Sequence, residues 1–139
     1  MSHSILKLSS VVLFVALFQS GCGEKRVNGV GGTVKHSGQP IANLIVNFLP
    51  EKGMRASGMT DAQGKFTLVS AEGLPVGACK VWVTLPMTSP KDEALHQAVE
   101  KNREDPTIQE ILRKYGNSEA TQLIVEVKKS GHSIEINLD

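Results

Sequence analysis

The chain has 139 residues, 40% of them hydrophobic, which is enough for one domain with a modest core. Only 4% are aromatic, so the core is expected to consist of Val, Ile and Leu, which favours strands over a helical bundle. The formal net charge is +1, and without an N-terminal segment that contains Lys7 it is zero, with 14 Lys and Arg against 14 Asp and Glu. Because the sequence also has no basic run, we expect no nucleic-acid partner.

Residues 1–21 have the features of a signal peptide. Lys7 supplies a positive charge, and an apolar run extends from Leu8 to Phe18. This run is about half the roughly 20 residues that a helix needs to cross a bilayer. The segment therefore predicts export rather than a permanent transmembrane span, and residues 22–29 are expected to be the start of the mature chain and a short polar tether.

The segment Ser20-Gly21-Cys22 resembles the cleavage box of bacterial lipoproteins, in which the cysteine receives a diacylglycerol and becomes the first mature residue. The resemblance implies a lipid anchor at Cys22. Because Gly23 rather than an acidic residue follows, it also implies delivery to the outer membrane or the cell surface. Gln19 stands where this family usually has leucine, so secretion or a periplasmic location without lipidation is the alternative.

A disulfide between Cys22 and Cys79 is a further alternative in an oxidising compartment. However, Cys79 lies in an alternating strand pattern beside Val81 and Val83. This position favours a small buried hydrophobic residue over a disulfide partner.

Seven short segments alternate apolar and polar residues as strands do, and turn residues separate them. The expected strands are 31–35, 41–49, 55–60, 66–69, 79–85, 123–127 and 133–138. The second of these places Leu44, Val46 and Phe48 on its buried face. No helices alternate with the strands, so the pattern predicts an all-β, antiparallel sandwich.

Two of the connections are expected to be β-hairpin turns. In the first, Thr60–Phe66, Asp61 can accept hydrogen bonds from the amides that follow it, and Gly64 can adopt a positive φ. Phe66 then enters the next strand pointing into the core. The second, around Ser130-Gly131, is expected to join the last two strands as a closing hairpin.

Six short motifs lie in these strands and in the turns between them: Gly32-Thr33-Val34, Gly38-Gln39-Pro40-Ile41, Val46-Asn47-Phe48, Thr60–Phe66, Pro75-Val76-Gly77 and Lys80-Val81. Together they resemble the carboxypeptidase regulatory-like domain over about residues 30–86. The resemblance implies a seven-stranded, Greek-key, transthyretin-like β-sandwich for residues 30–139. This chain has Cys79 where the family commonly has Tyr. In zinc carboxypeptidases such a domain is an accessory to the catalytic one, so the resemblance implies no catalytic activity.

An insertion at about residues 88–118, which the minimal family domain lacks, has the pattern of two helices. Ser89 is the expected N-cap of the first helix, whose apolar side is thin, so we expect this helix to be half exposed. The second helix is expected to begin at Asp105-Pro106 and to end at Gly116. Its apolar stripe has helical spacing and consists of Ile108, Ile111, Leu112 and Tyr115.

We expect this stripe to pack on the sandwich, and the alternative is a docking surface for another protein. On the polar face, Arg113 and Lys114 are candidate contacts for such a partner. Because the strands on either side already carry complete apolar faces, the whole insertion is expected to be separable from the fold.

Residues that could support catalysis or bind metal are scattered along the sequence. His36, His96 and His132 are far apart and have no Cys or His at metal-ligand spacing. The turn at Asp61 lacks the further oxygen ligands of a calcium loop, and no serine lies in a nucleophile elbow. We therefore expect no metal, no cofactor and no enzymatic activity.

The function expected from these observations is that of a non-catalytic, lipid-anchored protein of the cell envelope, acting as a structural or protein-interaction module. Its expected partners are a membrane, through the anchor, and an unknown envelope protein. A carbohydrate-binding module is an alternative, for which Trp82 and Tyr115 are the only Trp and Tyr available for stacking on a glycan. A small hydrolase is the third hypothesis.

Overall fold

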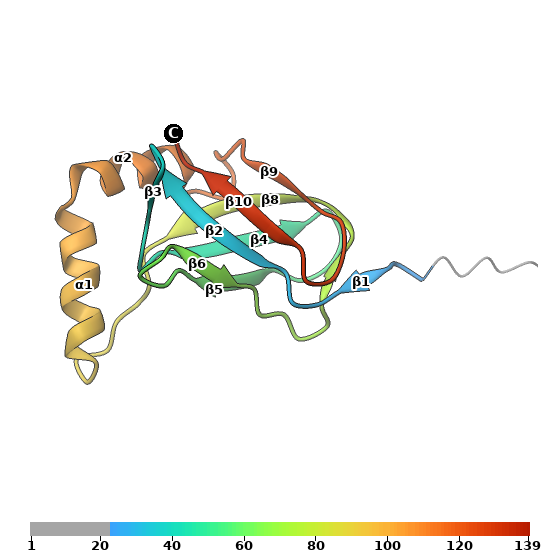
Figure 1. Cartoon of the computed structure of the whole chain (residues 1–139), viewed down its shortest axis with the longest axis horizontal. Coiled ribbons are helices and arrows are strands. Elements are labelled where there is room, and N and C mark those ends of the chain that lie inside the picture. Colours follow the sequence, from blue (N-terminus) through green and yellow to red (C-terminus); the bar gives the residue numbers. More distant parts are fainter. Residues whose placement is uncertain (1–22) are drawn as a thin grey trace, which may run out of the picture.

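The structure, a computed structural model, describes residues 23–139, so the expected signal peptide and Cys22 lie outside the described residues. The fold is rich in strands, which form three sheets, and it includes two helices (Figure 1). The first sheet contains β10 (Ser133–Asn137), β2 (Gly31–His36), β6 (Lys65–Thr67) and β3 (Gln39–Pro40). The second contains, in spatial order, β5 (Ala56–Met59), β4 (Ile45–Pro50), β8 (Gly77–Thr84) and β9 (Ile124–Val127). The third pairs β1 (Arg26–Val27) with β7 (Leu74–Pro75).

The two four-stranded sheets share one hydrophobic core. Leu44, Val46 and Phe48 are fully buried in it, as the alternation along this strand predicts. The seven strands longer than two residues correspond to the seven expected segments. The members of this core run from Val27 to Leu138, so it draws on nearly the whole of the described chain.

The last two strands do not form the expected closing hairpin. β9 pairs antiparallel with β8 in the second sheet, whereas β10 pairs parallel with β2 in the first sheet. The turn that contains Gly131 therefore carries the chain from one sheet to the other, and the expectation of purely antiparallel pairing is wrong. The physical reason is that alternating apolar and polar residues identify the buried face of a strand. The same alternation suits any neighbouring strand, whether parallel or antiparallel.

The arms of the turn at Thr60–Phe66 also belong to different sheets. β5 pairs with β4, and β6 pairs with β2, so a single bridge between Ser57 and Val69 joins the two arms directly. The expected hairpin is instead a crossing between sheets. Turn residues specify a reversal of the chain, but they do not specify which strands satisfy the backbone groups of each arm.

Two glycines allow β2 to lie between closely approaching neighbours. A Cβ at Gly32 would lie 1.8 Å from the carbonyl oxygen of Ile134 in β10, and one at Gly31 would lie 2.4 Å from the carbonyl oxygen of Phe66 in β6. Neither distance is compatible with a side chain, so glycine is required by close approach of the backbone on both sides of β2.

Helix α1 (Glu93–Glu104) begins later than the sequence predicts. Asp92 is its N-cap, because Oδ1 of Asp92 accepts a hydrogen bond from Leu95 N at 3.1 Å. Ser89 is not the cap; its carbonyl oxygen accepts from Asp92 N at 3.0 Å in the preceding turn. Both residue types can cap a helix, and the one nearer to the helical apolar positions does so here.

Helix α2 (Pro106–Tyr115) has the expected ends, with Asp105 as N-cap and Gly116 as C-cap. Its residues Ile108 and Ile111 are buried in the core that the two sheets share. The apolar stripe of α2 therefore packs on the core that the two sheets share, as expected, and the separability of the insertion stays a prediction.

Only α1 stands off the end of the two sheets (Figure 1). Val99 is its one buried residue, and Nδ2 of Asn102 donates to the carbonyl oxygen of Ala42 at 2.9 Å. These contacts hold α1 to the loop before β4, and most of its surface is exposed, as expected. Among residues 23–139, no helix is both long and apolar enough to span a bilayer.

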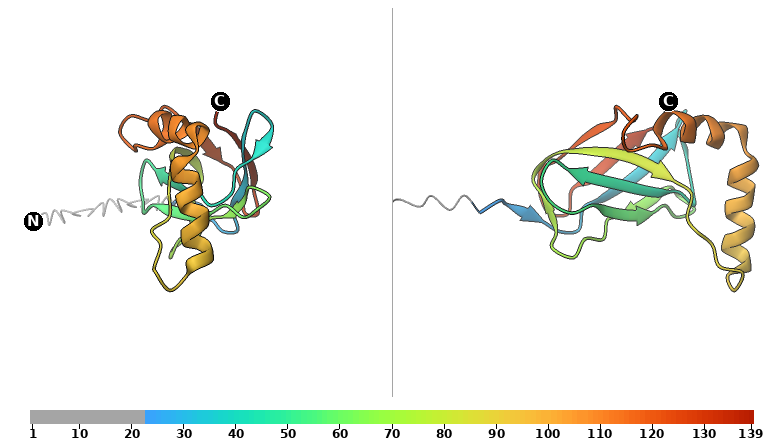
Figure 2. Two further views of the ribbon diagram at one scale, coloured as in Figure 1. Left: turned by 90° about the vertical axis from the view of Figure 1, so that its left-hand side faces the viewer. Right: turned by 180° about the vertical axis from the view of Figure 1, so that it is seen from behind.

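The described chain begins at the end of the molecule opposite α1 (Figures 1 and 2). We call this the N-terminal end; it comprises residues 23–30, 51–55, 68–77 and 128–132. Hydrogen bonds join its segments: Val76 N donates to the Lys25 carbonyl oxygen at 3.0 Å, and Gly131 N donates to that of Asn28 at 2.9 Å. Val27 is buried in β1, so the tether expected over 22–29 is shorter and, among described residues, consists of Gly23–Lys25.

We expect Gly32→Ala to lower the free energy of unfolding by about 3 kcal/mol, because the added methyl group would force β2 and β10 apart. Denaturant titration monitored by circular dichroism measures this change. Thr33→Ala on the same strand is the control and should cost less than about 1 kcal/mol. Equal stability of both variants would show that β10 does not pack against Gly32.

Candidate functional site

The turn predicted from sequence is held by hydrogen bonds within itself and to β2. Oδ1 of Asp61 accepts from Gln63 N and from Lys65 N, both at 2.9 Å. Gly64 has φ +72, and a Cβ there would lie 2.6 Å from the carbonyl oxygen of Val34. The Gly64 carbonyl oxygen in turn accepts from Val34 N at 2.8 Å. Asp61 and Gly64 thus fix the point at which the chain crosses between sheets.

Phe66 leaves this turn and is buried in the core. Its ring lies 6.1 Å, centroid to centroid, from that of Phe48, at an interplanar angle of 39°. Because Phe66 belongs to the first sheet and Phe48 to the second, this aromatic contact joins the two sheets. The three turn residues therefore have structural roles in the fold.

A groove of about 510 Å³ lies where α2 meets the start of β9. Its lining residues are Lys114, Tyr115, Ala120, Gln122 and Leu123. Two of these, Lys114 and Tyr115, are among the residues that the sequence suggested for contact with a partner.

Hydrogen bonds to the last residues of the described chain hold one wall of this groove in place. The Tyr115 hydroxyl donates to the backbone oxygen of Asp139 at 2.7 Å, and the Lys114 ammonium donates to the same oxygen. Oδ1 of Asp139 accepts from Ser37 N at 2.7 Å. These bonds tie α2 to the turn between β2 and β3, so the groove is formed by rigid elements rather than by a free loop.

The other candidate interaction residues divide by burial. Ile108 and Ile111 are buried in the core and cannot contact a partner. Leu112 is partly buried against the same core. The Arg113 side chain is 76% exposed, and its one salt-bridge partner within the described chain is Glu110 at 3.6 Å. The structure therefore leaves Arg113 and Lys114 exposed, while Tyr115, like Leu112, is half-buried against the core.

The two residues considered for glycan stacking are not presented together. Trp82 is buried in β8, and Tyr115 lies on α2 with its hydroxyl bonded to Asp139. A stacking site needs an aromatic face that a sugar can cover. Neither residue offers such a face in combination with the other.

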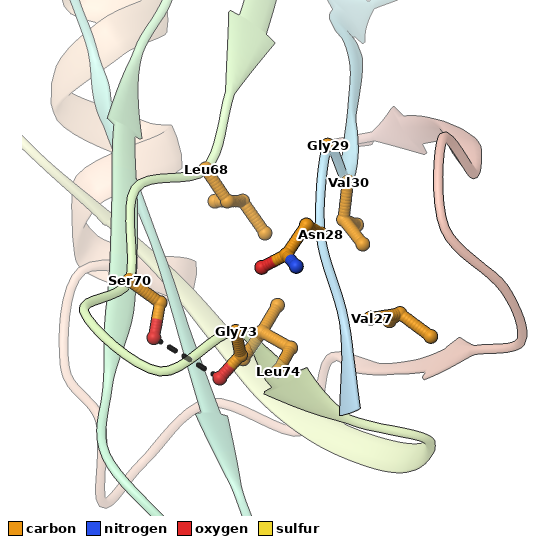
Figure 3. A pocket seen from close by; sticks show the side chains of 8 residues that line it. All are labelled: Val27, Asn28, Gly29, Val30, Leu68, Ser70, Gly73 and Leu74. Atoms are coloured by element: carbon orange, nitrogen blue, oxygen red, sulfur yellow. Dashed lines mark hydrogen bonds between the residues drawn. The ribbon is translucent and has the colours of Figure 1, made fainter. Parts of the chain in front are cut away.

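A much smaller cavity of about 40 Å³ lies beside β1 at the N-terminal end (Figure 3). Apolar side chains and glycines form most of its lining, and Asn28 points toward it between Leu68 and Leu74. The Ser70 hydroxyl donates its proton to the Gly73 carbonyl oxygen at 3.1 Å and so does not donate into the cavity. The volume has room for a few water molecules at most and marks the joint where β1 closes onto β7.

The reactive and titratable side chains have separate surroundings. Cys79 is 1% exposed, and burial raises the pKa of its thiol, which fits the expected small buried residue. His36, His96 and His132 each contact a different group: the Leu138 carbonyl oxygen, the Thr88 hydroxyl and the Lys128 amide. Within residues 23–139, no three His, Cys, Asp or Glu side chains lie close enough together to bind a metal ion.

Comparison of the chain with protein-family models, with curated proteins and with solved structures found no match in any of the three. Its residues and their geometry are therefore the basis on which function is inferred.

Removal of the Phe66 ring should cost about 3–5 kcal/mol of unfolding free energy in Phe66→Ala, because it leaves a cavity between the two sheets. Lys65→Ala, at the exposed neighbouring position, is the control and should change stability by less than about 0.5 kcal/mol. Chemical denaturation of both variants measures the difference. If the two variants unfold at the same denaturant concentration, the Phe48–Phe66 contact does not join the sheets.

Proposed function

We propose that this chain is a non-catalytic, lipid-anchored protein of the cell envelope that binds another envelope protein at its helical end. The helical end comprises α1, α2 and the groove lined by Lys114 and Tyr115. Cys22 carries the anchor, and the β-rich domain acts as a spacer that presents the helical end to the partner.

The observation that carries this proposal is the arrangement of the two ends. Only Gly23–Lys25 separate Cys22 from β1, and an extended chain of three residues spans about 10 Å. α1 and α2 lie at the opposite end of the sheets (Figure 2). An anchor at Cys22 therefore places the N-terminal end against the membrane and directs the groove away from it.

The geometry of the turn supports a carboxypeptidase regulatory-like, transthyretin-like fold with Greek-key connections, as the motifs imply. Asp61, Gly64 and Phe66 fill the structural roles that such a motif requires, and seven strands longer than two residues build the two larger sheets. The parallel pairing of β10 with β2 is the feature to compare in any relative whose structure becomes known.

Lipidation is tested by metabolic labelling with a palmitate analogue in bacterial cells. We expect the wild-type chain to incorporate label and to partition into the detergent phase, because each buried methylene contributes about 0.8 kcal/mol of membrane affinity. Cys22→Ser should abolish both properties. Cys79→Ser is the matched control and should retain the label; persistent labelling of Cys22→Ser, or a wholly soluble wild type, would contradict the anchor.

The partner site is tested by cross-linking and mass spectrometry in intact cells. We expect Arg113→Glu to lower the yield of the main cross-linked partner about tenfold, because it reverses the charge of an exposed cation next to Lys114 of the groove lining. Lys65→Glu makes the same charge change on the exposed face of β6 and should leave the yield unchanged. Equal yields from Arg113→Glu and the wild type would remove the helical end as the binding site.

A further inference from the structure

The charges of the described chain are distributed unevenly between its two ends. At the N-terminal end, six basic residues stand against three acidic ones, a surplus of three positive charges. The basic residues are Lys25, Arg26, Lys52, Arg55, Lys128 and Lys129, and the acidic ones are Glu24, Glu51 and Glu72. Counting Glu126 in β9, next to this end, leaves a surplus of two.

The helical end carries the opposite surplus. Residues 88–120 contain five basic and seven acidic residues, and Asp139 beside α2 adds one more negative charge. Residues 23–139 as a whole have 14 of each sign. The domain therefore has no net charge, but it has a cationic end and an anionic end.

Most of the cations at the N-terminal end are available for an outside partner. Arg26 contacts Glu24 and Glu72, each at 3.7 Å. The other five cations are exposed and have no salt bridge to any described residue. Two of the three acidic residues are thus occupied by one arginine, while the lysines project freely.

Apolar side chains lie among these cations. Met54 is 61% exposed and Val76 is 39% exposed. A hollow at this end is lined by residues of three of its segments, Glu24, Lys52 and Val76 among them, so the charged and apolar groups share one surface. Free lysines around exposed apolar side chains are the combination that contacts a lipid surface: the cations attract anionic headgroups, and the apolar groups enter the interface.

We propose that the N-terminal end binds the headgroups of anionic phospholipids, so that the domain rests on the membrane in one orientation. The proposal rests on the proposed function, since the anchor at Cys22 brings this end to the membrane. The three-residue tether of about 10 Å is no longer than the Debye length at 0.1 M salt. The lysines therefore stay within electrostatic reach of the surface.

The contact would orient the whole molecule. With the cationic end on the lipid, the helical end points away from the surface, and its negative charge disfavours the reverse orientation. The groove beside Lys114 and Tyr115 is then held at a fixed distance from the membrane. The domain has fewer orientations to lose when a partner binds, which lowers the entropic cost of binding.

The test uses the mature chain, residues 22–139, with Cys22→Ser, so that no lipid anchor contributes. Flotation with vesicles of equal parts phosphatidylglycerol and phosphatidylcholine is compared with flotation with phosphatidylcholine alone. We expect at least tenfold stronger binding to the anionic vesicles, lost at 0.5 M salt. A denaturant melt of the same sample confirms that it is folded.

Charge variants then locate the contact. Each lysine near an anionic surface contributes about fivefold to partitioning, so Lys52→Gln with Lys129→Gln should weaken vesicle binding about 25-fold. Lys91→Gln with Lys101→Gln makes the same change in net charge at the helical end and should leave binding within twofold of the parent.

Equal binding to the two kinds of vesicle would overturn the proposal, as would an equal loss in both pairs of variants. Capture of a protein by the N-terminal end in cells, with no preference for anionic vesicles, would overturn it in favour of a protein contact. Because the vesicle assay uses no lipidated chain and the palmitate assay depends only on Cys22, failure of one does not imply failure of the other.

Discussion

The contact between Phe48 and Phe66 is the interaction on which the rest of the fold depends, because it joins two sheets whose strands share few direct backbone connections. Phe66 reaches this position only because Asp61 and Gly64 turn the chain from the second sheet into the first. The same crossing recurs at Gly131, where the chain leaves β9 and enters β10. The domain is therefore closed by connections between sheets rather than by hairpins within them.

Closure of the first sheet requires the close approach of β6 and β10 to β2. Gly31 and Gly32 make this approach possible, since a Cβ at either would collide with a neighbouring backbone. Once β10 is in place, Leu138 enters the core and Asp139 reaches the last turn of α2. The groove at the helical end is thus a consequence of how the first sheet closes, and its shape depends on residues distant in sequence.

The arrangement of the two ends connects this fold to the proposed function. The chain enters through β1 at a cationic end with free lysines, and the insertion lies at an anionic end. In the proposed function, an anchor, a spacer and a binding surface follow one another along the axis of the molecule. α1 adds exposed, highly charged surface at the far end, while α2 contributes Ile108 and Ile111 to the core.

Local patterns in the sequence predicted the seven longer strands, both ends of α2 and the buried faces of β4 and β8. These features follow from periodicity and capping, which are local. The parallel pairing of β10 with β2 and the need for glycine at position 32 became clear only from the folded structure. Strand pairing and close backbone approach depend on which surfaces meet in the folded chain. The alternation of apolar and polar residues along a strand is the same whichever strand pairs with it. The opposite charges of the two ends likewise emerge only when loops from four parts of the chain meet at one end.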